Sequence, residues 1–222
     1  MNVVVTGAAN GLGAAICSKL PKDWHICKID HAYGHDVRAP HESWWPLSLD
    51  VLINCAGVNK IGWLEDFSES DWDQVLGTNA YGIFAMTKRA LPALSAARGT
   101  VLNIVSDAAH RPMRGSAAYN ASKGAAHILT LQLARELFQR HGITVFGISP
   151  NKLKGTGMSR SIDEQVIKTR GWTAEQAQAY QLAGLAIGEE TEPLVLAEFI
   201  AFLLSEKYRH KYLHGCIIPY GA

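Results

Sequence analysis

The sequence predicts a single doubly wound α/β domain over residues 1–222, with a mostly parallel sheet of about six or seven strands and helices on both faces. Short apolar, β-branched runs such as Asn2 to Val5 and Thr100 to Val105 are typical of strands buried in a parallel sheet. Longer helix-compatible segments lie between such runs and end at glycine or proline. This alternation is the order expected of parallel strands joined by crossover helices.

Composition limits the function classes. The chain has 222 residues, 48% of them hydrophobic and 18% charged, which suits one soluble domain with a sizeable core. A net charge of +1 predicts neither a nucleic-acid partner nor an anionic membrane partner. The apolar runs are too short for a membrane span, and the first residues do not resemble a signal peptide. Four cysteines without metal-ligand spacing indicate free thiols and a cytoplasmic location.

A glycine-rich turn follows the first predicted strand. Gly7, Gly11 and Gly13 recur in Thr6-Gly7-Ala8-Ala9-Asn10-Gly11-Leu12-Gly13, and a helix-compatible stretch comes next. Backbone amides at a helix N-terminus can hold a pyrophosphate, so this order predicts a dinucleotide site that includes Asn10 and Leu12. The alternative interpretation is an ordinary tight glycine turn.

Asp30 ends the second predicted strand, His25 to Ile29. A carboxylate at that position accepts hydrogen bonds from the adenine-ribose hydroxyls and repels a 2′-phosphate. No arginine or lysine occupies residues 8–10 or 31–32. The sequence therefore favours NAD(H) over NADP(H), although Lys28 lies nearby.

Residues 100–123 carry the predicted chemistry. Ser106 ends a buried strand, and Tyr119 and Lys123 stand one helical turn apart. A free phenol has a pKa of about 10, and a nearby ammonium lowers it towards the range of a general acid/base. The serine hydroxyl would hold the substrate oxygen. None of these groups moves a hydride, so a cofactor is required.

Ser106, the run Tyr119-Asn120-Ala121-Ser122-Lys123 and the glycine turn together resemble the short-chain dehydrogenase/reductase family, in its short, single-domain branch. The resemblance implies a Rossmann-like fold and reversible NAD(H)-linked oxidation of a secondary alcohol, a small molecule, to a ketone. It makes Tyr119 the catalytic acid/base, Lys123 the ligand of the nicotinamide ribose and Ser106 the residue that positions the substrate. Asn79, within Thr78-Asn79-Ala80-Tyr81-Gly82, would hold a water in a proton relay.

Further cofactor contacts follow from the same resemblance. Asn54-Cys55-Ala56-Gly57 resembles the family's Asn-Asn-Ala-Gly strand end, so Asn54, Ala56 and Gly57 are expected beside the cofactor. Asp36-Val37 resembles the Asp-Val pair that lines the adenine pocket.

The nicotinamide end departs from the family at one residue. Pro150 matches the usual proline, and Leu153 corresponds by offset to the residue whose backbone binds the carboxamide. Asn151 stands where the family has glycine, and we expect it to keep the turn because asparagine tolerates positive φ.

The segment between Asp30 and the next strand, Asp50 to Asn54, is too short for the helix, strand and helix that the family usually has there. One outer helix near the adenine side is therefore predicted to be missing, which leaves the adenine end open. The segment contains His31, His35, Asp36 and His41. Without a typical ligand spacing, a polar loop is favoured over a metal site, and no metal is predicted.

Residues 155–190 occupy the place of a substrate lid, as two helices separated by Gly171. The lid is expected to determine substrate specificity, but the sequence does not identify the substrate. Arg111, Arg114 and Lys152 flank the site. They are either solvated or contacts for an acidic or polar substrate, and solvation is the simpler interpretation.

Other predictions concern assembly and alternatives. In the family, the two long helices, here about 68 to 90 and 116 to 140, commonly form oligomer interfaces, so a homo-oligomer (dimer or tetramer) is expected. Ser70 is the expected N-cap of the first of these two helices.

A catalytically silent NAD-binding regulator or scaffold of the same fold is the main alternative function. An epimerase or dehydratase acting on sugar nucleotides is disfavoured by the glycine spacing and the short C-terminal part.

Overall fold

In a computed structural model, which describes residues 1–205 and 210–221, six parallel strands form one sheet in the order β2-β1-β3-β4-β5-β6. This confirms the predicted doubly wound architecture, because the strand order reverses direction between β1 and β3. The strands are β1 (Asn2–Thr6), β2 (His25–Ile29), β3 (Val51–Asn54), β4 (Thr100–Ile104), β5 (Thr144–Pro150) and β6 (Ile217–Tyr220).

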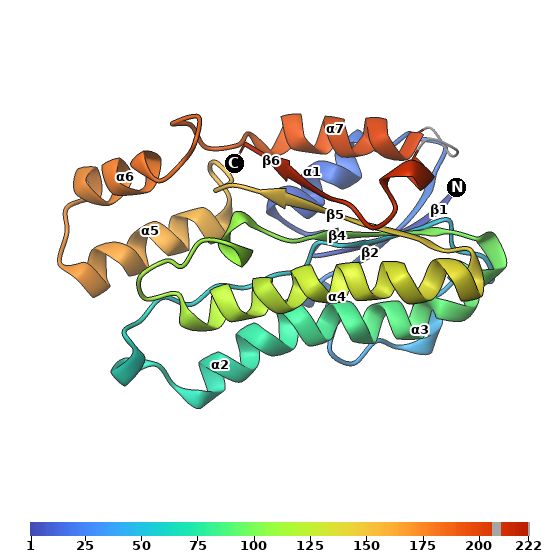
Figure 1. Cartoon of the computed structure of the whole chain (residues 1–222), viewed down its shortest axis with the longest axis horizontal. Coiled ribbons are helices and arrows are strands. Elements are labelled where there is room, and N and C mark those ends of the chain that lie inside the picture. Colours follow the sequence, from blue (N-terminus) through green and yellow to red (C-terminus); the bar gives the residue numbers. More distant parts are fainter. Residues whose placement is uncertain (206–209, 222) are drawn as a thin grey trace.

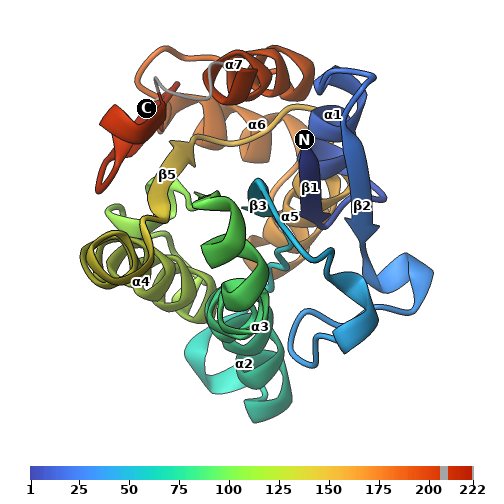
Figure 2. The same ribbon diagram turned by 90° about the vertical axis from the view of Figure 1, so that its right-hand side faces the viewer.

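Helices cover both faces of the sheet, α1 and α7 on one and α3 and α4 on the other (Figures 1 and 2). None of the helices within the described residues is both long and apolar enough to cross a bilayer. The helices are α1 (Gly11–Lys19), α2 (Glu69–Leu76), α3 (Gly82–Ala97), α4 (Ala117–His141), α5 (Gly157–Arg170), α6 (Ala174–Ala183) and α7 (Pro193–Ser205).

The core forms two layers because the strands are apolar on both sides. Val3, Val5 and Ile53 point towards α1 and α7, whereas Val4 and Leu52 point towards α3 and α4. All five side chains are at most 1% exposed. Successive side chains of a strand face opposite ways, so a buried parallel strand needs an apolar residue at every position.

The adenine side is reduced as predicted. Residues 31–49, all of them described, form only two short 3₁₀ turns, His31–Tyr33 and Glu42–Trp44, and β2 is the edge strand. Val37 and Leu49 are buried in the core layer beneath α3, and Trp44 and Trp45 pack partly against it. This loop therefore covers part of the face that the missing helix would cover (Figure 2).

The first long helical segment differs from its prediction at two points. Ser68, not Ser70, is the N-cap of α2, because its Oγ accepts the amide of Asp71 at 3.1 Å. A π-helical turn, Gly77–Tyr81, then joins α2 to α3. Such turns put one extra residue into a helix and are frequent at functional sites.

The carboxyl ends of the strands meet at one edge, and α5 and α6 lie beyond that edge (Figure 1). Gly171, with φ +66°, separates α5 from α6 as expected. A parallel sheet of this type binds ligands at its carboxyl edge, so the fold positions a site between the strands and these two helices.

Candidate active site

Ser106, Tyr119 and Lys123 come together at the carboxyl end of β4. Ser106 caps the short turn after the strand, where its Oγ accepts the amide of Ala108 at 3.2 Å and donates to Asp107 Oδ1 at 3.1 Å. Lys123 donates from Nζ to the Ile104 carbonyl at 3.0 Å. Ser106, Tyr119 and Lys123 are each at most 9% exposed.

Burial controls the charges of this cluster. It raises the pKa of Tyr119 to about 12, while the Ser106 hydrogen bond lowers that pKa and Asp107 raises it further. Burial also lowers the pKa of Lys123 to about 8, against a smaller raising effect of Cys55. The expectation that Lys123 brings the Tyr119 pKa below that of a free phenol is therefore wrong for the protein without ligand. Desolvation disfavours the charged forms of both groups, and Lys123 is not among the groups that shift the pKa of Tyr119.

Asn79 is held rigidly in the π-helical turn. Its Oδ1 accepts the Val58 amide at 2.9 Å, and its Nδ2 donates to the Val58 carbonyl and to Ser122 Oγ, each at 2.9 Å. Gly57 lies beside it. A Cβ built on Gly57 would be 3.5 Å from Asn79 Oδ1 and 4.0 Å from Lys123 Nζ, so Asn79 and Lys123 converge on this glycine.

The glycine turn has no space for side chains at two positions. A Cβ on Gly7, whose φ is +68°, would be 2.8 Å from Ala56 Cα, and one on Gly13 would be 2.1 Å from the Gly7 carbonyl oxygen. The first helical hydrogen bond runs from Ala14 N to Asn10 O, so the amides before it have no acceptor within α1. A close backbone turn with free amides at a helix N-terminus fits a dinucleotide pyrophosphate.

Asp30 lies directly after β2 and beside this turn. Its Oδ2 accepts the amide of Ala9 at 2.9 Å, and its Oδ1 accepts the amide of Ala32 at 2.8 Å. These bonds fix the carboxylate at the edge of the cavity described next, and each oxygen keeps a lone pair for a ribose hydroxyl.

One cavity of about 550 Å³ runs from the glycine turn past the Ser106 cluster to α5 and α6. It collects most of the predicted site residues on its walls. These are Gly7, Asn10, Gly11, Leu12, Gly13, Asp30, Gly57, Ser106, Tyr119, Lys123, Pro150 and Leu153.

Five predicted residues lie outside these walls. Asp36 forms an ion pair with Arg38 at 2.7 Å, and Val37 packs under Gly82. Asn54 donates from Nδ2 to Asn103 Oδ1 at 2.8 Å inside the core. Ala56 presents its backbone to Gly7, and Asn79 lies behind Gly57. The cofactor contacts assigned to Asp36, Val37, Asn54 and Ala56 and the relay role assigned to Asn79 stay predictions, as do the roles assigned to the residues on the walls.

The histidine-containing loop shows no metal geometry. Asp36 is paired with Arg38, the ring of His35 packs against Trp44, and His41 caps a 3₁₀ turn. No group of three metal-ligating side chains gathers anywhere in the described parts of the chain.

Among the described residues, Arg98 is the one non-glycine residue with a positive φ. Asn151 therefore does not adopt the positive φ that we expected of it. Instead, its side chain joins three segments. Nδ2 donates to the carbonyls of Glu189 and Gly221, at 3.1 and 2.7 Å, and Oδ1 accepts the amide and hydroxyl of Thr191.

The individual cavity residues contributed by α5 and α6 were not predicted from the sequence. Among those lining the cavity are Met158, Arg170, Tyr180 and Gln181. Trp63 joins this part to the other wall by donating from its indole to the Thr169 carbonyl at 3.2 Å. No local pattern distinguishes such residues from an ordinary amphipathic helix, because the facing wall comes from distant segments.

A sequence model of the short chain dehydrogenase family matches residues 37–167, more than half of the chain. The chain belongs to the short-chain dehydrogenase/reductase family. This confirms the resemblance from the sequence, and it places the protein among oxidoreductases with a Rossmann-like, nucleotide-binding fold.

The relatives of this chain are named for different compounds. It is 30% identical to 2,3-dihydro-2,3-dihydroxybenzoate dehydrogenase of Escherichia coli K12, over 78% of this chain and 69% of that one. It is also 30% identical to acetoacetyl-CoA reductase of Rhizobium meliloti, over 91% and 90%. A crystal structure of an actinorhodin polyketide ketoreductase with NADPH matches at a TM-score of 0.82, with 25% identity over 99% and 95%.

Proposed function

We propose that this short-chain dehydrogenase transfers a hydride between NAD(H) and a secondary alcohol or its ketone. The main supporting observation is that Ser106, Tyr119 and Lys123 open into the same cavity as the glycine turn. One ligand spanning that cavity reaches both the pyrophosphate cradle and the proton-transfer residues.

The nicotinamide supplies the hydride chemistry, and the chain supplies the proton. With a pKa of about 12, Tyr119 holds its proton near neutral pH, as a general acid for ketone reduction must. Ser106 donates a hydrogen bond to the same substrate oxygen while charge develops there. The reverse oxidation requires Tyr119 to lose its proton, so a positive charge close to the phenol is needed in that direction.

Lys123 and Asn79 are proposed to return the proton. Lys123 has a pKa of about 8, so it is mostly charged at neutral pH and can exchange a proton within a small range. It converges with Asn79 on Gly57, where the missing side chain leaves space beside both polar groups. A water held there would connect Lys123 to the Val58 backbone, which Asn79 orients.

Asp30 supports NAD(H) as the cofactor. Its carboxylate is fixed beside the glycine turn by two backbone amides, and a 2′-phosphate would bring two negative charges to it. Fluorescence titration of the purified protein with NADH and with NADPH tests this assignment. We expect NADH to bind at least tenfold more tightly, and Asp30→Ser to reduce that ratio. Equal binding of both by the wild type would contradict the assignment.

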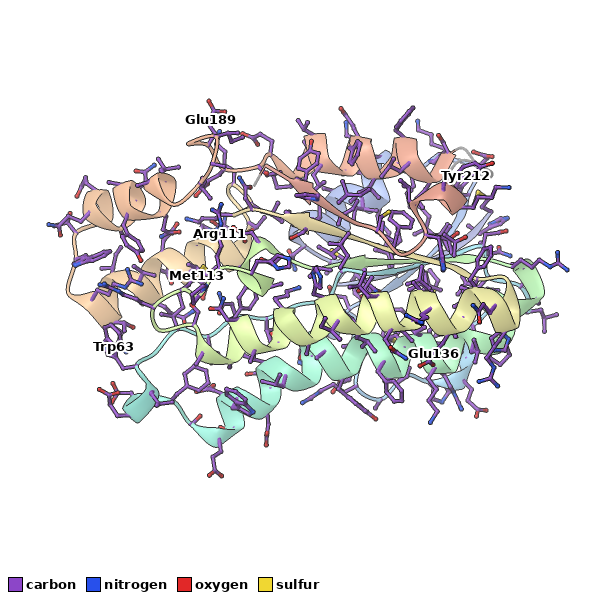
Figure 3. All side chains as sticks on the ribbon, in the orientation of Figure 1. Trp63, Arg111, Met113, Glu136, Glu189 and Tyr212 are labelled. Atoms are coloured by element: carbon purple, nitrogen blue, oxygen red, sulfur yellow. The ribbon has the colours of Figure 1, made fainter. Side chains whose placement is uncertain are left out.

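Turnover tests the catalytic assignment. We expect Tyr119→Phe to lower kcat by at least a thousandfold with a competent alcohol and to leave NADH binding within threefold, because only the proton donor is lost. Tyr212→Phe, on an exposed side chain far from the cavity, is the matched control (Figure 3). A kcat of the Tyr119→Phe variant within tenfold of the wild-type value would contradict the assignment of Tyr119 as the proton donor.

The reduced adenine side is the observation that favours a second candidate function, a catalytically silent regulator. A silent NAD-binding regulator of the same fold predicts NADH binding without turnover of any alcohol or ketone in a broad panel. The burial of both Ser106 and Tyr119 on the cavity wall favours the enzyme, because a binder gains nothing from that pair. A cytoplasmic location and a homo-oligomer complete the proposal.

A further inference from the structure

The part of the cavity formed by α5, α6 and the loop after β4 is rich in arginine. Arg111, Arg114 and Arg170 line it, and within residues 1–205 and 210–221 none of them forms an ion pair with a carboxylate. Lys152 differs, because it is neutralised by Asp163 and Glu190 at 2.6 and 2.8 Å. The unbalanced positive charge therefore belongs to the three arginines.

Arg170 is the most constrained of the three. It ends α5, and its guanidinium carbon lies over the rings of Trp172 and Tyr180, 4.7 and 4.5 Å from their centroids. Nη2 donates to the Arg114 carbonyl at 3.1 Å. Nη1 is buried and has no hydrogen-bond partner in the described structure. The aromatic rings fix the plane of the guanidinium and leave one of its donors unused.

An unused buried donor on a cation is costly. Leaving such a group without a partner destabilises the folded protein, and more so when the group is charged. A planar guanidinium that is already oriented forms bidentate bonds with carboxylate or phosphate oxygens. Arg170 lines the cavity, so an oxyanion of a ligand there would meet a cation whose plane Trp172 and Tyr180 already fix.

Building on the proposed function, we infer that the substrate of this enzyme carries an oxyanion, a carboxylate or a phosphate, that binds Arg170 at the end of the cavity away from Tyr119. Arg111 supports this end. It reaches from the loop after β4 towards α6, where its Nη1 donates to the Gly184 carbonyl at 2.9 Å (Figure 3). The first turn of α5 lies at the site, since a Cβ on Gly57 would be 3.8 Å from Met158 Cε, and the helix is 14 residues, roughly 20 Å, long, so Arg170 at its last residue is remote from the Lys123 end of the cavity.

Binding of small amphiphiles tests this inference without any turnover. The probes are hexanoate and hexyl phosphate, each compared with the neutral hexanamide and 1-hexanol of similar chain length. Isothermal titration calorimetry of the full chain measures affinity. Tryptophan fluorescence serves as a second readout, because Trp172 lies against Arg170.

Three variants separate the guanidinium from general charge. Arg170→Gln removes the cation, Arg170→Lys keeps the charge without the planar fork, and Lys168→Gln removes an exposed cation from the same helix outside the cavity. We expect one or both anionic probes to bind at least tenfold more tightly than the neutral ones. That preference should be lost in Arg170→Gln, reduced in Arg170→Lys and unchanged within twofold in Lys168→Gln. The tighter anion identifies the oxyanion.

Equal binding of anionic and neutral probes to the wild type, or full anion binding by a folded Arg170→Gln protein, would overturn the inference. Circular dichroism establishes that the variants fold. Tyr119→Phe distinguishes this inference from the proposed function, since it should abolish turnover and leave hexanoate and hexyl phosphate binding within twofold of the wild type.

Discussion

At Tyr119 two influences on the phenol act in opposite directions. The sequence shows a lysine one turn away, which by itself lowers the tyrosine pKa. The structure adds burial, which raises the pKa of Tyr119 to about 12 and lowers that of Lys123 to about 8. Neighbouring residues follow from spacing along a helix, whereas burial depends on how the whole carboxyl edge packs around the pair.

The Lys123 pKa predicts how stability depends on pH. Its folded value of about 8 lies below the unfolded value of 10.5, so the unfolded state binds more protons between these pH values. Stability must therefore rise with pH in that range. Relative to Lys123→Met, the wild type should gain up to about 3 kcal/mol in free energy of unfolding between pH 8 and 10.5. Urea unfolding at several pH values measures this, and a difference independent of pH would show that Lys123 is not desolvated.

At the scale of secondary-structure elements, the side chain of Asn151 connects segments that are distant in sequence. It lies in the turn after β5, where the family usually has glycine, so we expected the backbone conformation, a positive φ, to decide which residue is tolerated there. In the structure its amide links β5 to Glu189, Thr191 and Gly221. The hydrogen-bond partners come from about 40 and 70 residues further along the chain. They could not be assigned to Asn151 from local sequence.

Substitution of Asn151 separates the two interpretations. We expect both Asn151→Ala and Asn151→Gly to destabilise the protein by about 2–3 kcal/mol, because the carbonyls of Glu189 and Gly221 and the Thr191 side chain lose their bonds to the buried Asn151 amide. Thr191→Val, which removes only one bond to Asn151, should cost about 1 kcal/mol. Urea unfolding compares the three variants. A stable Asn151→Gly protein would show that the turn, not the side-chain bonds, decides this position.

At the scale of the whole molecule, α3 and α4 leave apolar side chains in water. Phe84 is 41% exposed, Ile128 65% and Phe138 44%. These helices are the ones for which the family resemblance implies an interface, and a second copy would bury this surface. The association itself stays a prediction.

Solution mass tests the predicted assembly. We expect the wild type to sediment as a dimer or tetramer and Ile128→Lys to shift it towards smaller species, because a buried charge weakens an apolar interface. Leu47→Lys, which changes a 98% exposed side chain in the 31–49 loop, is the control and should leave the mass unchanged. A monomeric wild type at micromolar concentration would contradict the prediction.

Several features of this protein follow from the sequence alone. The parallel α/β class, the glycine turn, the Ser106–Tyr119–Lys123 set, the missing outer helix and the break at Gly171 are all visible as local patterns. Local patterns succeed there because strand burial, tight turns and helical spacing depend on residues close in sequence.

Tertiary structure alone decided the rest. The pKa values of Tyr119 and Lys123, the π-helical turn at Asn79, the bonds of Asn151 and the unpartnered donor of Arg170 arise where segments distant in sequence meet. Desolvation and hydrogen-bond satisfaction depend on every atom around a group, so the order of residues along the chain does not determine them.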